Sequence, residues 1–494
     1  MIIKTNPDEI QIYLTDASNI KGFCDAVYFP ENVDELRRTI QEANENKINV
    51  TISGNGTGLT GARVPMGGIV VSTEKLNRVI EINAEEKFII VEPAVLLSDL
   101  QSAVNELGLL YPPDPTERNC YIGGTVATNA SGEKTFKYGA TREYVLALDI
   151  VLANGDLLLL QRGKQKAEND RLQLFCESGK RLDISIPDYK MPETKNASGY
   201  FCKPDMDAVD LFIGSEGTLG IITKIKLELV PKLEKKLSCV LFFNDEDNAI
   251  NFVLKARRVS LQSQKEKNEK EINALALEFF DGNALKFLSA DYKIIPADAS
   301  GAVWFEQEVT SQNEEDILMK WIELIAEFDG NEETAWLAFD DAEIKKIQQF
   351  RHSVSAKVNE YISKNNFKKL GTDAAVPAEK FVEFYKYCTS LVKKSKIDYV
   401  TYGHFGNSHI HLNILPKNSE EHLIGKELYK KICMKAIELN GTVSAEHGIG
   451  KLKIEYLTMM YGEDVIKKMA VIKRAFDPNL ILGIGNIIDK KYLT

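Results

Sequence analysis

The sequence is poor in the features that mark several common functional classes. Its 7 cysteines are scattered and form no CxxC pair, which argues against a thiolate zinc site, an iron–sulfur cluster and a disulfide framework. The 61 basic and 72 acidic residues give a net charge of −11, so no basic excess is available to neutralise nucleic-acid phosphates or an anionic membrane. We therefore expect no nucleic-acid partner, and contact with a membrane only through a local, peripheral patch.

Long apolar runs are also missing. The start, MIIKTNPDEI, has no basic stretch followed by an apolar core. The most apolar later run, residues 145–160, is interrupted by Asp149, Asn154 and Asp156. The sequence thus predicts neither a signal peptide nor a transmembrane segment, and the unpaired cysteines favour a reducing, cytoplasmic location.

The chain has enough length for two or three well-packed domains, with 494 residues of which 44% are hydrophobic. Its first part alternates short β-rich runs with helical spacing, and GSEGTLG (214–220) followed by Pro231 is typical of a domain end. From about residue 233 longer helical patterns predominate. The pattern predicts an α+β protein whose second domain begins near residue 232.

Individual segments make this expectation specific. A helix is predicted to begin at Ser98, whose spacing to Gln101 is that of a capping box, and to end at Gly108. Residues 162–208 are expected to form a charged, irregular insert. The other predicted elements are strands at 49–53, 69–73, 78–82, 88–93 and within 142–160, and helices at 33–46, 342–362 and 378–395.

A glycine-rich loop, GNGTGLTG (54–61), satisfies the GxGxxG pattern of a Rossmann dinucleotide site, but we reject that interpretation. The Rossmann fingerprint requires a helix to begin inside the motif, whereas here Pro65 and two further glycines lead straight into a strand. The loop instead resembles a run of free backbone N–H groups that can bind phosphate, although alone it fits a plain hairpin equally well. Two more small-residue loops, at 123–132 and 214–220, favour a large diphosphate cofactor.

Half of the six histidines lie in GHFGNSHIHLN (403–413). The flanking segments have β character and FGNS is typical of a turn, so we predict a hairpin whose four-residue loop puts His404 opposite His409. His404, His409, His411 and Asn413 would then share one face, which is the geometry of a metal site. The alternative is that one or two of the histidines are merely exposed.

A further ligand is offered by TVSAEHGIGK (442–451), where Glu446 and His447 are adjacent. Glycines around them permit the tight backbone from which neighbouring residues can address one site. Two histidines and a glutamate suit zinc, manganese or iron(II).

Taken in order, residues 54–61, 112–115, 123–132, 214–220, 403–413 and SAEHGIG (444–450) resemble those of FAD-linked 2-hydroxyacid dehydrogenases with the vanillyl-alcohol-oxidase-type (PCMH-type) flavin fold. That family includes D-lactate dehydrogenase, the flavin subunit of glycolate oxidase and D-2-hydroxyglutarate dehydrogenase. The resemblance implies a two-subdomain FAD-binding domain at 20–231 and an α+β substrate and metal domain at 232–494, whose last segment packs back on the flavin.

The resemblance also assigns roles to residues. It implies that His404, His411 and Glu446 bind a divalent metal, that His447 is the catalytic base and contacts substrate, and that Arg351 and Asn413 hold the substrate. Without it, Arg351 would be taken for a surface helix arginine. The residues implied to contact FAD are Ser53, Gly54, Asn55, Gly56, Thr57, Gly58, Leu59, Gly61, Pro113, Asp114, Gly123, Gly124, Thr125, Thr128, Asn129, Gly132, Gly139, Glu216, Gly220, Ile221 and Asn486.

The sequence departs from the family in three places. Position 409 is commonly asparagine there, a lysine near Gly371 in some relatives is missing, and LGIGNI (482–487) replaces the family's usual NPGK-like ending. We expect His409 to lie beside the metal or to face the substrate rather than to bind the metal, with a merely tolerated histidine as the alternative. Because no histidine precedes residue 352, a histidyl-FAD bond in the first domain is excluded and FAD is expected to be non-covalent.

The implied reaction is oxidation of a D-2-hydroxyacid such as D-lactate, glycolate or D-2-hydroxyglutarate. The C2 hydrogen would go to flavin N5, while a metal lowers the hydroxyl pKa and His447 takes the proton. Electrons would then pass to a quinone, a cytochrome or an electron-transfer protein, and a homodimer is allowed. The alternatives are a flavin-free metalloenzyme with a His2Glu site, either a hydrolase or an iron(II) oxygenase, and a non-catalytic binding subunit.

Overall fold

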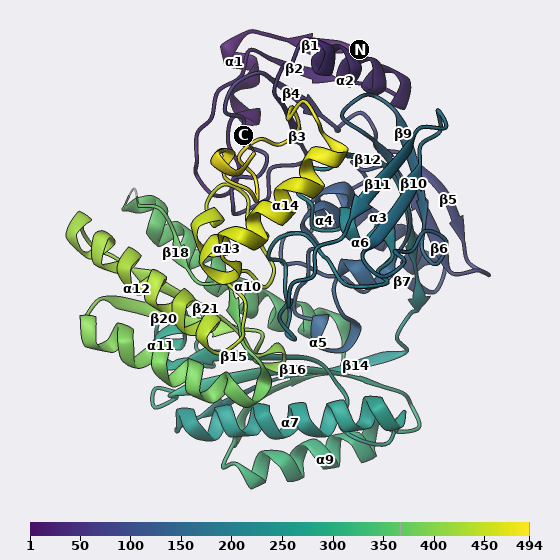
Figure 1. Cartoon of the computed structure of the whole chain (residues 1–494). Helices are drawn as coiled ribbons and strands as arrows, with labels where there is room; N and C mark the ends of the chain where they lie inside the picture. The colour runs from purple at the N-terminus through teal and green to yellow at the C-terminus, as the bar shows by residue number, and fades with distance from the viewer. Residues whose placement is uncertain (366, 494) are drawn as a thin grey trace.

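The computed structural model describes residues 1–365 and 367–493, which form two lobes joined along a broad interface (Figure 1). The first lobe contains one sheet in the order β1-β2-β4-β3, whose last three strands are parallel, and an antiparallel sheet in the order β5-β6-β12-β8-β9. The strands are β1 (Ile2–Lys4), β2 (Ala26–Phe29), β3 (Val50–Ser53), β4 (Ile69–Ser72), β5 (Val79–Asn83), β6 (Phe88–Val91), β8 (Val145–Val151), β9 (Leu157–Gln161) and β12 (Ile221–Glu228).

The helix predicted at 33–46 is present as α2 (Val33–Glu45), and its ends show why the sequence folds here. The side chain of Asn32 accepts the N–H of Glu35, which caps the first turn. Leu36 and Ile40 are buried at helical spacing and pack on the parallel sheet. Short connecting elements complete the lobe: α1 (Pro7–Ile10), β7 (Leu109–Leu110), α5 (Thr135–Tyr138), α6 (Ala208–Phe212) and β13 (Val230–Pro231).

Two sequence predictions for this lobe are wrong. The helix α3 (Leu97–Glu106) does not begin with a capping box at Ser98; the backbone N–H groups of Leu97 and Ser98 instead donate to carbonyls of Cys120 and Arg118, so a neighbouring loop caps the helix. The segment 123–132 is not simply a loop, because residues up to Thr128 form the helix α4 (Ile122–Thr128). Buried Ile122 and Val126 anchor α4 in the core, which small-residue composition alone does not reveal.

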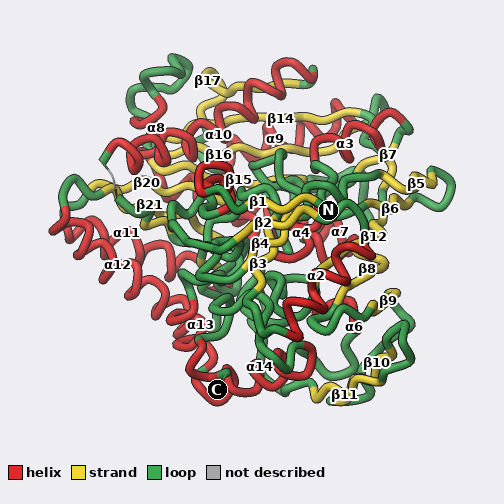
Figure 2. The backbone as a smooth tube through the Cα atoms, turned by 90° about the horizontal axis from the view of Figure 1, so that it is seen from above, coloured by secondary structure: helices red, strands yellow, loops and turns green. Residues whose placement is uncertain are grey.

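The insert 162–208 is also more regular than expected. It contains a hairpin of β10 (Arg171–Phe175) and β11 (Arg181–Ser185), whose leucine and isoleucine side chains point inward while the alternate positions are exposed. Figures 1 and 2 both place this hairpin beside the C-terminal helix α14 (Glu463–Phe476), against which it packs. The strict alternation in RLQLF and RLDIS carried the signal for these strands.

The second lobe is built on one antiparallel sheet with helices on both faces. Its order is β17-β14-β16-β15-β20-β21-β18, with β19 paired to β21. One face packs on α7, α9, α11 and α12, and the other on α8 and α10, so successive residues of β14 enter different cores. The elements are β14 (Lys235–Phe243), α7 (Glu246–Glu266), β15 (Ala274–Asp281), α8 (Gly282–Leu288), β16 (Gly301–Val309), α9 (Glu314–Glu327), β17 (Asn331–Ala338), α10 (Asp341–Lys364), β18 (Leu370–Gly371), β19 (Ala374–Ala375), α11 (Phe381–Ser395), β20 (Asp398–Gly403), β21 (His409–Leu415) and α12 (Ser419–Glu438).

The last segment of the chain returns to the first lobe. Helices α13 (Ile454–Tyr461) and α14 bury Leu457, Met469 and Phe476 in the same apolar core as α3 and α4. The backbone of Val50 in β3 exchanges hydrogen bonds with Ile481 and Gly483. The yellow C-terminal segment of Figure 1 therefore lies over the first lobe, although it follows the second in sequence.

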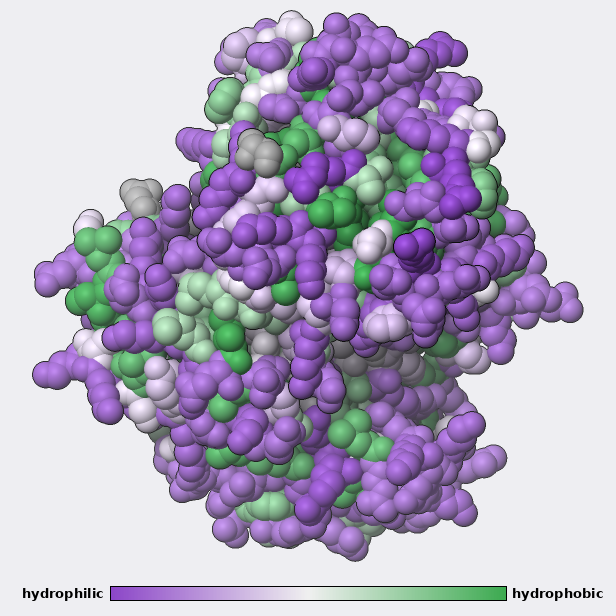
Figure 3. Space-filling view, in the orientation of Figure 1, coloured by the Kyte–Doolittle hydropathy of each residue, from purple (hydrophilic) through white to green (hydrophobic). Residues whose placement is uncertain are grey.

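The surface seen in Figure 3 is largely hydrophilic, with apolar side chains scattered between polar ones. Among the described residues, no helix combines the length and apolarity needed to cross a membrane.

Candidate functional site

The histidine hairpin forms as predicted, between β20 and β21. The backbone N–H of His409 donates to the carbonyl of His404 at 3.3 Å across the loop, and Tyr402 pairs with His411. The imidazole rings of His404, His409 and His411 gather in the interior, with ring centres 5.2 Å (His404–His409), 5.4 Å (His404–His411) and 4.4 Å (His409–His411) apart. All three are buried, so the alternative of exposed hairpin histidines does not apply.

Glu446 approaches the same histidines. Nε2 of His404 lies 3.1 Å from Oε1 of Glu446, and Nε2 of His411 lies 3.4 Å from Oε2. The other ring nitrogen of each histidine is in a hydrogen bond: Nδ1 of His404 lies 2.6 Å from Glu278 Oε1, and Nδ1 of His411 lies 3.1 Å from the carbonyl of Thr372. Imidazoles that bind a metal are oriented in this way, so these residues fit a divalent cation.

Charges from the first lobe reach this cluster. Nζ of buried Lys195 forms an ion pair with Oε1 of Glu446, and the hydroxyl of Ser131 donates to the same oxygen at 3.2 Å. Burial raises the pKa of Glu446, but His404 and Lys195 lower it by more. The pKa of this carboxyl group therefore lies well below its ordinary value. Burial likewise lowers the pKa of His404, but Glu278 and Glu446 raise it beyond its ordinary value. The ammonium group of Lys195 therefore lies beside the Glu446 carboxylate.

Asp373 fixes the turn that carries Glu446 and His447. Its carboxylate accepts the backbone N–H groups of Glu446 at 3.1 Å and His447 at 3.0 Å, together with Nζ of Lys453 at 2.7 Å. Burial raises its pKa, but His447 and Lys453 bring it well below the ordinary value. A buried aspartate that binds two consecutive N–H groups holds the turn in one conformation.

His447 is presented as a neutral base. Its Nδ1 lies 3.3 Å from Asp373 Oδ2, and its ring is nearly parallel to that of His411 at 5.6 Å. Burial lowers the pKa of His447 to about 4, against the opposing effect of Asp373. At neutral pH the imidazole is unprotonated and can accept a proton.

Arg351 and Asn413 lie at the edge of the cluster. Arg351 is 2% exposed, and its Nε donates to Glu278 Oε2 at 2.7 Å, so the same carboxylate orients both Arg351 and His404. This burial excludes the surface helix alternative. Nδ2 of buried Asn413 donates to the carbonyl of His411 at 3.2 Å, while Oδ1 is without a partner among the described residues. A Cβ at Gly371 would come within 2.5 Å of Asn413 Oδ1, so glycine there leaves room for this amide.

The glycine-rich loops converge around α4. Residues 54–61 connect β3 to β4 without an intervening helix, as the rejection of a Rossmann site predicted. The Asn55 side chain donates to the Asn119 carbonyl, so the loop at 54–61 meets the segment that leads into α4. The N–H of Glu216 donates to the Ala127 carbonyl at 2.8 Å, so the loop at 214–220 contacts the C-terminal part of α4.

Space remains beside this loop cluster. A Cβ added to Gly124 would meet nothing within 4 Å, and one added to Gly54 or Gly58 would approach no atom closer than 3.8 Å. Backbone that faces open space beside a helix N-terminus suits a large diphosphate cofactor. The cluster contains Ser53, Gly54, Asn55, Gly56, Thr57, Gly58, Leu59, Gly61, Pro113, Gly123, Gly124, Thr125, Thr128 and Asn129.

Several residues implied to contact FAD have internal partners. The Asp114 carboxylate pairs with Arg118 at 2.9 Å and Lys134 at 2.6 Å. Gly132 packs on the carbonyl of Asp114, Gly139 against Glu143, and Gly220 against Ile150, and Ile221 is the first residue of β12. These residues thus pack against neighbouring protein segments and stabilise the loop cluster.

Glu216 and Asn486 connect the last segment to the loops. The Glu216 carboxylate accepts the N–H groups of Ile449 and Gly450, each at 2.6 Å, and burial raises its pKa to about 7. The Asn486 side chain donates to the carbonyls of Ala62 and Glu216 and accepts Nζ of Lys451 at 2.6 Å. The turn after His447 is thereby fastened beside residues 54–61.

Sequence reasoning missed Glu278, Asp373 and Lys195. Glu278 had a detectable signal, since it interrupts the apolar run ALALEFFD (274–281) of a buried strand. Asp373 and Lys195 lie in irregular segments with no such pattern.

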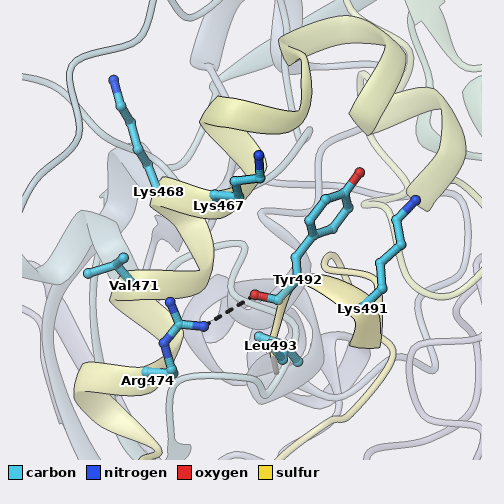
Figure 4. A pocket seen from close by; sticks show the side chains of 7 residues that line it. All are labelled: Lys467, Lys468, Val471, Arg474, Lys491, Tyr492 and Leu493. Atoms are coloured by element: carbon cyan, nitrogen blue, oxygen red, sulfur yellow. Dashed lines mark hydrogen bonds between the residues drawn. The ribbon is translucent and has the colours of Figure 1, made fainter.

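A separate basic hollow of about 600 Å³ lies on α14 (Figure 4). It is lined by Lys467, Lys468, Val471, Arg474, Lys491, Tyr492 and Leu493. It shares no residue with the histidine cluster or with the glycine-rich loops.

Comparison with known proteins agrees with this geometry. A family model described as FAD linked oxidases, C-terminal domain, matches residues 234–487, and one described as FAD binding domain matches residues 24–161. The glycolate oxidase subunit GlcD of Bacillus subtilis (strain 168) is 30% identical, over 97% of this chain and 92% of that protein. The D-lactate dehydrogenase of Archaeoglobus fulgidus is 31% identical, over 93% and 90%.

A solved structure, of alkyldihydroxyacetonephosphate synthase, shares the fold with a TM-score of 0.66 at 14% identity, over 97% of this chain and 82% of that one. This two-domain α+β architecture was predicted. The chain therefore belongs to the FAD-linked oxidases and is an FAD-linked oxidoreductase.

Proposed function

We propose that this protein oxidises a D-2-hydroxyacid, of the D-lactate, glycolate or D-2-hydroxyglutarate type, to the 2-oxoacid. FAD would be held non-covalently by a domain at 20–231, and a divalent cation by His404, His411 and Glu446 in a domain at 232–494. The observation that carries the proposal is the convergence of both histidine Nε2 atoms on the Glu446 carboxylate, beside a neutral His447. The names of the relatives, a glycolate oxidase subunit and a D-lactate dehydrogenase, support the substrate class.

The chain's own residues have separable tasks in this reaction. When bound, FAD supplies a hydride acceptor, and a divalent cation supplies positive charge that lowers the pKa of the substrate hydroxyl. His447, held at Nδ1 by Asp373, accepts the hydroxyl proton at Nε2. Lys453 and Asp373 keep the turn of His447 in place during the transfer.

Arg351 is suited to bind the substrate carboxylate. Only Nε is engaged by Glu278, which orients the guanidinium and leaves its two terminal amino groups for a two-pronged contact. Asn413 Oδ1, which has no partner among the described side chains, accepts hydrogen bonds and is therefore suited to a donor group of the substrate rather than to its carboxylate. The open space beside the loops of the first lobe would take the diphosphate and the ring system of FAD.

The rival functions are less well supported. A flavin-free hydrolase or iron(II) oxygenase would use the same two histidines and glutamate. Such an enzyme would not explain why residues 24–161 match the FAD binding domain. A non-catalytic subunit would have no need for a buried base and arginine around a carboxylate.

The test is anaerobic mixing of the purified, FAD-containing protein with a panel of D- and L-2-hydroxyacids. A D-acid is expected to bleach the flavin absorbance while its L-isomer does not. A protein that carries FAD but is bleached by no member of the panel would overturn the substrate class. Acid precipitation should release all of the flavin, and flavin that stays on the denatured chain would contradict non-covalent binding.

A further inference from the structure

His409 is a buried imidazole without a normal partner. Its side chain is 0% exposed, and neither ring nitrogen has a hydrogen-bond partner among the described residues. Asp373 Oδ1 lies 3.1 Å from Nε2 and is the acceptor available on that side of the ring, so Nδ1 is the nitrogen left without any partner among the described residues. A fully buried polar group left unpaired destabilises the folded state, so a missing partner is the natural explanation.

Its neighbours indicate what that partner is. One ligand atom from each of His404, His409, His411 and Glu446 can be chosen so that all lie within 4.8 Å of one another. His409 and His411 are two residues apart on β21 and therefore share a face of the sheet, and the loop brings His404 to the same place.

Each of the three rings also has an oxygen on its outer side. His404 has Glu278, His411 has the Thr372 carbonyl and His409 has Asp373. Such an outer oxygen orients an imidazole so that its other nitrogen faces a metal. In His409 this leaves Nδ1, which is buried and unpaired.

We propose that His409 is a fourth protein ligand, which makes the centre His3Glu rather than His2Glu. This inference rests on the metal site of the proposed function, and it replaces the sequence-based expectation that His409 stands aside. Four protein donors fill a tetrahedral zinc site and leave no position for substrate, whereas a six-coordinate ion retains two. To hold substrate as well, the centre therefore suits a six-coordinate divalent ion, of the Mn²⁺ or Fe²⁺ type.

The experiment uses the FAD-containing protein, stripped of metal with a chelator and titrated with Co²⁺. Ligand-field bands are read as a difference spectrum at wavelengths longer than those that oxidised flavin absorbs. The variants are His409→Asn, His404→Asn and His411→Asn. His422→Asn is the matched control, because His422 stacks on Phe367 and lies outside the cluster. Flavin content and far-ultraviolet circular dichroism establish folding, and His409→Gln serves if the asparagine variant does not fold.

The wild-type protein should bind one Co²⁺ with the weak bands of a six-coordinate ion. His409→Asn should change those bands and weaken Co²⁺ binding by more than the roughly 10–100-fold that loss of an outer hydrogen-bond partner costs. His404→Asn and His411→Asn should behave alike, and His422→Asn should match wild type.

An unchanged Co²⁺ spectrum in His409→Asn would overturn the inference while the proposed function stands. Intense four-coordinate bands in the wild type would overturn the six-coordinate geometry. A wild-type protein that binds no Co²⁺ would remove the metal site itself, and with it this part of the proposed function.

Discussion

The two lobes meet at one site but differ in how they are built to hold a ligand. Around α4 the first lobe offers backbone and small residues next to open space, as at Gly54 and Gly124. Around β21 the second lobe offers buried ionisable side chains that restrain one another, as His404, Glu446 and Asp373 do. A large, flat cofactor requires room for its surface, whereas a small cation requires fixed donors, and each lobe is suited to one of these needs.

The separation is incomplete, because each lobe sends residues into the other. Lys195 and Ser131 of the first lobe bind Glu446, and Glu216 binds the N–H groups of Ile449 and Gly450. Because the clustered metal donors lie in the second lobe and the glycine-rich loops in the first, we still predict that cofactor and metal can be lost independently, while catalysis requires both.

The largest effect should come from Glu446→Gln. This change removes the only carboxylate among the four clustered donors, so divalent metal and turnover should both be lost. FAD should stay bound, because the glycine-rich loops belong to the other lobe. Metal analysis and flavin absorbance measure the two outcomes, with Glu455→Gln on the exposed surface as control. An active variant with full metal content would show that Glu446 is not a ligand.

His447→Asn should keep both ligands but slow the chemistry. Loss of a general base reduces the rate of flavin reduction by roughly 100-fold or more. Stopped-flow measurement of the reductive half-reaction, with metal content determined on the same sample, checks this. If flavin reduction proceeds at the wild-type rate, His447 is not the base.

Gly124→Val should act on the cofactor side alone. Nothing lies within 4 Å of the new Cβ, so the apoprotein should fold with an unchanged melting temperature. If FAD occupies the adjacent space, crowding of roughly 1–3 kcal/mol should weaken its binding by about 10–100-fold. Fluorimetric titration with FAD gives the affinity, and an unaltered value would place the cofactor elsewhere.

The smallest effect should come from Asn486→Ala, which tests how the last segment is fastened. The change removes the amide that donates to the carbonyls of Ala62 and Glu216 and one of the acceptors of half-buried Lys451, and should lower the free energy of unfolding by roughly 1–2 kcal/mol. Asn479→Ala, which removes an exposed pair with Asn44, is the matched control. Urea denaturation compares the two, and equal stabilities would argue against a fastening role.

Local sequence patterns predicted the elements whose stability is local. The helix α10 and the strands β20 and β21 appeared where periodicity indicated, and the four-residue loop brought the histidines together. The prediction of a capping box at Ser98 failed because the first N–H groups of the helix donate to carbonyls of residues 118–120, which lie in a later loop of the chain. A pattern within one segment cannot reveal donors that another segment satisfies.

The same limit applies to the site. His404, His411, Glu446 and His447 are found from residue type and spacing because each pair is adjacent in sequence or on one hairpin. Asp373 and Lys195 enter only through tertiary packing, at distances of 73 and 251 residues from Glu446. Arg351 was identified only through the family resemblance, because the sequence of its helix is amphipathic and an arginine there is expected on the surface. Its burial became evident only in the structure.

The most direct test of two ligand sites serving one reaction is flavin reduction before and after metal removal. The FAD-containing protein is mixed anaerobically with a reactive D-2-hydroxyacid, then treated with a chelator, and finally resupplied with Mn²⁺. The account predicts bleaching at first, its loss after chelation while FAD remains bound, and its return with the metal. Bleaching at an unchanged rate in protein shown to be metal-free would contradict it.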